Sequence, residues 1–290
     1  MKRLVLTALT LACAVQISPA AELTPDTLMA WNAYSREADS RMQARGDGRS
    51  PFLWLDESPE NAARVRQGEV VIAPVVGHGT AAAPHGLIHD WIGSVFIPGA
   101  TVDDLLSVIQ NYDQYQTFYR PVVTSSRTLA CAGEKQEFQM VWQRKVLFVR
   151  AAMQGQYQAR DVFVDGRHGY SVAETVEMRE IQGYGHTDER LLPPDTGSGF
   201  IWRIRSMSRF EARDGGVYLE LEAIALTRDI PASLAWLVTP VVNRLSISSL
   251  SATLRQTRDA VISSRGTLKV SACCSKPARP SHSAATGKGE

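Results

Sequence analysis

Six strand-like segments follow one another between residues 125 and 229, with no helical pattern between them. An uninterrupted series of strands predicts an antiparallel sheet, whereas alternating strands and helices would predict a parallel one. A doubly wound α/β fold is therefore disfavoured. The expected strands are Ser125–Cys131, Glu137–Gln143, Val146–Gln158, His168–Ile181, Gly199–Glu211 and Val217–Asp229, the last two joined by the turn signal Asp214-Gly215-Gly216.

The hydrophobic period changes after Pro231, where a long helix is expected to run to about Ser264 and to be kinked at Pro240. Its apolar face is wide, so it requires a large cover, most simply the sheet. The apolar residues at helical spacing are Leu234, Leu237, Val238, Val241, Val242, Leu245, Leu250, Leu254 and Val261.

The strands are preceded by another strand and two short helices. Leu87–Ile97 is predicted to be a strand, Thr101 is expected to cap a helix, and a second short helix carries Tyr112 and Phe118. The predicted fold class is α+β, with a curved antiparallel sheet that wraps around a long C-terminal helix. One helix cannot fill the concave face of such a sheet, so an apolar cavity is expected.

An N-terminal extension is expected over residues 21–83. Thr24 and Pro25 predict a helix start, and the helix is expected to end near Gln43. A short helix is predicted over Pro59–Arg66, a strand over Glu69–Val75 and a loop over Gly77–Pro84. The segment is too small for a strong core of its own, so we expect it to pack on the main domain.

The two ends of the chain have the composition of processed or unstructured segments. Residues 1–20 are predicted to be a signal peptide cleaved after Ala20, which implies a periplasmic or secreted protein; lipoprotein processing at Cys13 is the less favoured alternative. Residues 265–290 are expected to be a disordered tail containing Cys273 and Cys274. Together with Cys131 they make an odd number of cysteines, which excludes a complete disulfide framework.

The main domain, residues 84–264, resembles the START-like helix-grip superfamily (SRPBCC), which includes the polyketide cyclase/dehydrase and lipid-transport group. Its last strand and helix, Val217–Leu226 and Pro231–Val261, are similar to the family's final strand and gripping helix. The other segments that carry the resemblance are Trp91–Pro98, Thr101–Gln110 and Asn111–Ser126. These features are topological, so they indicate the fold more strongly than the function.

The resemblance implies a protein that binds a lipid or another hydrophobic small molecule in an internal cavity, and the predicted signal peptide adds that it is exported. An aromatase/cyclase-like enzyme acting on a hydrophobic substrate in the same cavity is the alternative. Peripheral contact with a membrane is compatible with both, and the oligomeric state stays open. The residues expected to line the cavity are Trp91, Trp142, Tyr157, Trp202, Ile204, Leu221, Ala223 and Trp236.

Charged residues on the last two strands offer a different interpretation. Arg203, Arg205 and Arg209 share one face of their strand, and Glu220 and Glu222 share one face of the next. They could anchor a ligand head group or form an acid/base pair inside the cavity. We favour a solvated outer face, on which such ion pairs contribute little.

Other chemistries lack a motif. His85 and His89 would lie about 13 Å apart on a strand, too far to share an ion even with His78 nearby, so no metal is expected. No nucleophile elbow, dinucleotide fingerprint or P-loop occurs, so neither a hydrolase nor a nucleotide cofactor is expected. With 31 basic and 30 acidic residues, the chain gives no sign of a nucleic-acid surface.

Overall fold

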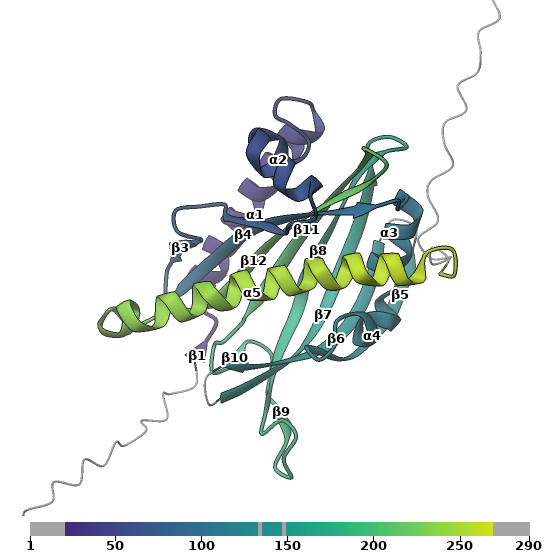
Figure 1. Cartoon of the computed structure of the whole chain (residues 1–290). Helices are drawn as coiled ribbons and strands as arrows, with labels where there is room; N and C mark the ends of the chain where they lie inside the picture. The colour runs from purple at the N-terminus through teal and green to yellow at the C-terminus, as the bar shows by residue number, and fades with distance from the viewer. Residues whose placement is uncertain (1–20, 133–134, 147–148, 269–290) are drawn as a thin grey trace, which may run out of the picture.

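A computed structural model describes residues 21–132, 135–146 and 149–268. Its main sheet is antiparallel and runs in the order β2-β4-β12-β11-β8-β7-β6-β5 (Figure 1). The strands are β2 (Val71–Pro74), β4 (Gly86–Pro98), β5 (Val123–Ala132), β6 (Lys135–Val146), β7 (Val149–Phe163), β8 (His168–Gln182), β11 (Arg203–Arg213) and β12 (Gly216–Arg228). The predicted α+β class and the antiparallel sheet are confirmed.

The long C-terminal helix α5 (Ala232–Ser264) crosses the concave face of the sheet, as predicted (Figure 1). Its second half packs Leu250, Leu254 and Val261 against apolar side chains of β4, β11 and β12. Gly93 on β4 permits this approach, because a Cβ there would lie only 2.8 Å from Leu254 Cδ1. A glycine therefore sets how closely the helix can approach the sheet.

Three shorter elements extend the α5 layer. They are α3 (Val102–Ile109), the 3-10 turn η2 (Tyr112–Gln114) and α4 (Tyr115–Phe118). Thr101 caps α3 through a capping box with Asp104, in which each side chain accepts a backbone N–H of the other residue. The predicted helix start at Thr101 is thereby confirmed.

The N-terminal extension covers the opposite, convex face. Thr24 caps α1 (Pro25–Gly46), which packs Trp31, Ala38 and Met42 against the outer side of the sheet. Strand alternation explains the division, because Phe210 of β11 packs on the α5 side while Met207 packs on the α1 side. The remaining elements of the extension are β1 (Ala21–Glu22), η1 (Trp54–Glu57), α2 (Pro59–Arg66) and β3 (Thr80–Ala83).

Short strands form in two places where the sequence pattern predicts none. Thr80–Ala83, inside the expected loop Gly77–Pro84, pairs with β4 as β3. Between β8 and β11, β9 (Arg190–Leu191) pairs with β8 and β10 (Thr196–Gly197) pairs with β1. Alanine-rich and polar sequences of this kind lack a strand pattern, and their pairing depends on neighbouring strand edges.

The expected signal peptide, and the expected tail beyond residue 268, lie outside the described residues. Among the helices of the described part, none is both long and apolar enough to cross a membrane.

Candidate functional site

The middle of the concave face forms a floor of small and apolar side chains. Two rows cross it from strand to strand, as the pairing registers show: Asp161–Ser171–Ser208–Leu221 and Ala159–Ala173–Ser206–Ala223–Trp91. The central members of these rows stay partly exposed, although they lie in the interior of a sheet with layers on both faces. On β11 and β12 the intervening residues, which face α1, are buried. On these two strands the concave face is therefore the less completely covered one, and we call this floor and the space above it the hollow.

The two halves of α5 are packed to different degrees. From Val238 to Ser249 no side chain is fully buried, in contrast to the buried residues Leu250, Leu254, Thr257 and Val261 of the second half. The second half packs with Leu221 and Ala223 of the floor, and the first half is packed more loosely.

Aromatic side chains form one wall of the hollow. The rings of Tyr112, Phe138 and Tyr157 are stacked, with centroids 4.1 Å and 4.8 Å apart. Trp142 Nε1 donates a hydrogen bond to the Tyr157 hydroxyl at 3.2 Å, and burial raises the pKa of Tyr157. Tyr119 is tied to α5 by a hydrogen bond with Thr257 at 3.1 Å, and burial raises its pKa to about 12.

The predicted ligand-contacting residues fall into two groups. By strand register or packing cluster, six lie on the concave face: Trp91, Trp142, Tyr157, Ile204, Leu221 and Ala223. Trp202 instead packs with Trp31 of α1, because it precedes β11 and does not continue the alternation of that strand. Trp236 lies on the surface of α5 with 76% of its area exposed, so the interior position expected for it is wrong. Contact of any of the eight residues with a ligand stays a prediction.

A buried polar cluster that the sequence analysis missed lies at the end of the first floor row. The Asp161 carboxylate is 5% exposed, and its Oδ2 accepts hydrogen bonds from Gln110 Nε2 at 2.8 Å and Gln136 Nε2 at 3.0 Å. The Tyr112 hydroxyl donates to Gln136 Oε1 at 2.8 Å. The strand expected here ended at Gln158, whereas β7 continues to Phe163, so Asp161 lay outside every expected strand.

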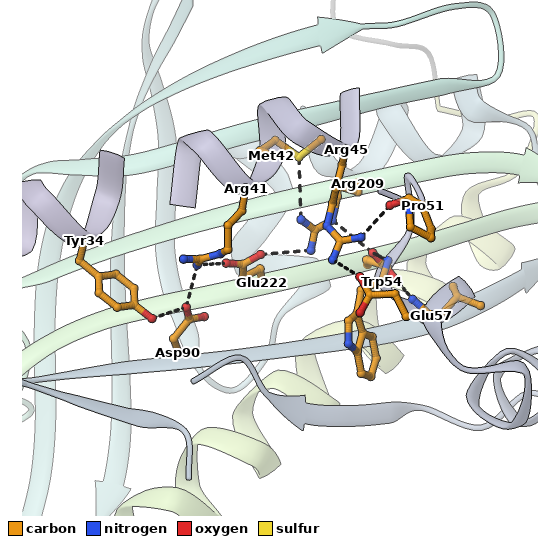
Figure 2. Close-up of polar contacts among 12 residues, drawn as sticks. Tyr34, Arg41, Met42, Arg45, Pro51, Trp54, Glu57, Asp90, Arg209 and Glu222 are labelled. Atoms are coloured by element: carbon orange, nitrogen blue, oxygen red, sulfur yellow. Dashed lines mark hydrogen bonds and ion pairs between the residues drawn. The ribbon is translucent and has the colours of Figure 1, made fainter. Parts of the chain in front are cut away.

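Arg209 of β11 and Glu220 and Glu222 of β12 lie on the convex face and are buried beneath the extension. Figure 2 shows Arg209 and Glu222 beside α1. Arg209, 1% exposed, donates from Nε to Glu220 at 3.2 Å and from Nη2 to Glu222 at 3.1 Å. Glu220 also accepts the backbone N–H groups of Trp54 and Leu55 at 2.9 and 2.8 Å. These bonds join η1 to the centre of the sheet.

Two residues of α1 extend this network toward β4. Arg41 Nη2 contacts Asp90 Oδ2 at 3.1 Å and Glu222 Oε1 at 3.0 Å, and the Tyr34 hydroxyl donates to Asp90 Oδ2 at 2.7 Å (Figure 2). Burial, reinforced by the Glu222 carboxylate, raises the pKa of Asp90 to about 7. The hydrogen bond from Tyr34 and the Arg41 guanidinium act in the opposite direction.

The expected solvated face for these charges is therefore wrong. Arg203 and Arg205 are also buried; Arg203 pairs with Asp195, and Arg205 pairs with Asp39 and Glu174. Strand alternation predicts which side chains share a face but not which element covers it. Because the charges lie on the face opposite the hollow, the aromatase/cyclase alternative loses the acid/base candidates that the sequence suggested.

His85 and His89, which the sequence analysis considered as metal ligands, occupy different environments. His89 is buried and hydrogen-bonded through Nε2 to the Thr227 hydroxyl at 3.1 Å, and burial lowers its pKa to about 4. His85 occupies the left-handed backbone region at φ 52° just before β4. Within the described residues no three His, Cys, Asp or Glu side chains gather as a metal-binding group.

A separate surface pocket of about 440 Å³ opens to solvent where the β11–β12 turn meets the start of α3. Thr101, Asp103, Arg213 and Gly215 are among its lining residues. None of the predicted ligand-contacting residues lines it, so it is distinct from the concave floor.

No protein-family model and no curated relative matches the chain. Among solved structures, the chain is similar to the STAR-related lipid transfer protein of Xanthomonas axonopodis, with 17% identity, coverage of 67% of this chain and 98% of that one, and a TM-score of 0.42. Human STARD10 shares 7% identity, with coverage of 71% of this chain and 80% of that one and a TM-score of 0.40. The Zhui aromatase/cyclase of Streptomyces sp. R1128 shares 14% identity, with coverage of 60% of this chain and 96% of that one and a TM-score of 0.36.

These neighbours are START-related and aromatase/cyclase proteins, the group that the sequence resembles. At such identities and TM-scores the likeness concerns the fold alone, and no ligand or activity transfers with it. The strand order and the position of α5 define the chain as an α+β protein of the helix-grip type.

The buried network on the convex face predicts that replacing Arg209, its central cation, strongly lowers the free energy of unfolding. Arg209→Met should lower the free energy of unfolding by about 3–5 kcal/mol, because it leaves buried Glu220 and Glu222 without their shared partner. Arg213→Met, on the same face of β11 but half-buried, should lower it by about 1 kcal/mol or less. Urea unfolding followed by circular dichroism measures both; equal losses would contradict the network's role.

The raised pKa of Asp90 predicts that the stability of the protein depends on pH. Its pKa in the folded protein lies above the unfolded value, so the native state holds a proton that the unfolded state releases between about pH 4 and 7. The Asp90 contribution to stability therefore falls as pH rises through this window. Urea unfolding at pH 4.5, 6 and 8 should show Asp90→Asn gaining stability relative to the parent protein as pH rises. A difference that is constant across pH would refute the raised pKa.

Proposed function

We propose that this chain binds a hydrophobic small molecule or lipid between the concave face of the sheet and the first half of α5. The observation that carries the proposal is the unequal coverage of β11 and β12. Their residues facing α1 are buried, whereas Ile204, Ser206, Ser208, Leu221 and Ala223 on the other face stay partly exposed. An apolar surface left open beneath a helix is suited to burying an apolar ligand.

The physical basis of binding would be apolar burial against this floor and the aromatic wall. Each Å² of apolar surface removed from water contributes about 25 cal/mol, before the ordering of ligand and protein is subtracted. Small residues such as Ser206 and Ala223 leave room above the strands, and Tyr157, at one end of the aromatic stack, neighbours Ala159 of the floor on the same face of β7.

Ligand entry at the loosely packed end of α5 is part of the proposal. There α5 starts after Pro231, and Trp236 is exposed. An exposed tryptophan favours the boundary between water and lipid, which supports peripheral contact with a membrane during exchange. The loop between β8 and β11 is the other candidate for a gate, since loops move more readily than packed strands.

Filling the floor should abolish binding. Ala223→Phe is expected to weaken binding of the neutral probe N-phenyl-1-naphthylamine at least tenfold, because the ring occupies the space proposed for the ligand. Ala130→Phe, at an exposed position on edge strand β5, is the matched control and should bind as the parent does. Fluorescence titration measures the affinities, and thermal melting confirms that the variants fold. If the parent protein does not bind the probe, or if Ala223→Phe binds it equally well, the proposal fails.

Export is the second part of the proposal and rests on the composition of residues 1–20. Expression of the full chain in a Gram-negative bacterium should place the mature protein in the periplasm or the medium. N-terminal sequencing should then begin at Ala21. Retention of the intact N-terminus in the cytoplasm would contradict export while leaving ligand binding untouched.

A further inference from the structure

The Asp161 carboxylate is buried without a cation. Within the described residues it makes no ion pair, and the hydrogen bonds it accepts come from the neutral amides of Gln110 and Gln136, both on Oδ2. Its second oxygen, Oδ1, is buried and has no hydrogen-bond partner. A buried carboxylate oxygen without a donor is costly, since it has lost its water and gained nothing in exchange.

A second acceptor in the same cluster is also unpartnered. Gln110 is 2% exposed, and because its Nε2 donates to the carboxylate, the atom left over must be the carbonyl oxygen Oε1. That oxygen is buried without a partner as well. The two unsatisfied atoms are both acceptors, so the chemistry that would satisfy them is a donor.

The cluster is continuous with the hollow. Asp161 pairs with Ser171, Ser171 with Ser208, and Ser208 with Leu221, so the carboxylate ends a row of side chains that crosses the partly exposed floor. The serines along this row are small and half-buried. An elongated molecule lying on the floor could therefore bring one end to Asp161.

We propose that the Asp161–Gln110 end of the hollow is a subsite for a hydrogen-bond donor. The ligand class is an apolar molecule that carries a protonated amine, the best partner for a buried carboxylate, in preference to one that carries an acid. This inference rests on the proposed function, because it assigns the polar end of the same ligand. The competing account is a buried water that satisfies both acceptors and leaves ligand preference unchanged.

Two probes of equal chain length test the subsite. Isothermal titration of the parent protein should give at least tenfold tighter binding of dodecylamine than of dodecanoate at pH 7. Asp161→Asn, which keeps the side-chain shape and removes the charge, should reduce that preference at least tenfold while N-phenyl-1-naphthylamine still binds. Asp259→Asn, on the exposed side of α5, is the matched control and should retain the parent preference.

The outcomes separate this inference from the proposed function. Binding of the neutral probe without preference for the amine, or with a preference that Asp161→Asn retains, would overturn the subsite and leave hydrophobic binding intact. Failure of all three probes to bind would overturn both. If Asp161→Asn does not fold, the preference measured on the parent protein decides, since an acceptor subsite cannot favour the acid.

Discussion

The hairpin of β11 and β12 is covered on both faces, and the arrangement of the whole molecule depends on this double coverage. One set of its alternating side chains faces α5 and the other faces α1. A sheet with a single layer would leave the Arg209 side in water, where its charges would need no partners. With α1 in place, the same charges must be paired with one another, while the apolar or small residues of the other face stay partly exposed.

The two coverings differ in chemistry. The α1 side is joined by apolar packing together with hydrogen-bonded charges that extend from Tyr34 to Glu220 (Figure 2). Each buried polar group of this network needs a hydrogen-bond or ion-pair partner. The network is therefore satisfied in only one position of the extension on the sheet. The α5 side relies on apolar contacts concentrated in its second half, which leave the first half free of such a constraint.

Much of this architecture could be predicted from the sequence, because the signals involved are local. Uninterrupted strand patterns, the cap at Thr101 and the long helical period after Pro231 each depend on neighbouring residues, and the elements formed as expected. The cover of the convex face depends on contacts between α1 and β12, nearly two hundred residues apart, so alternation alone favoured solvent there. The position of Trp202 was predicted wrongly because β11 begins at Arg203, so Trp202 lies just outside the strand and does not follow its alternation. Asp161 was overlooked because the expected strand ended at Gln158, three residues before it, and a lone aspartate has no motif around it.

The uneven grip of α5 has a mechanical consequence. Residues 250–261 are packed against the sheet, whereas the turns from Val238 to Ser249 bury no side chain fully. In the proposed ligand-binding role, displacement of these looser turns would admit a guest without unfolding the sheet. The energy barrier for exchange would then be separate from the stability of the fold.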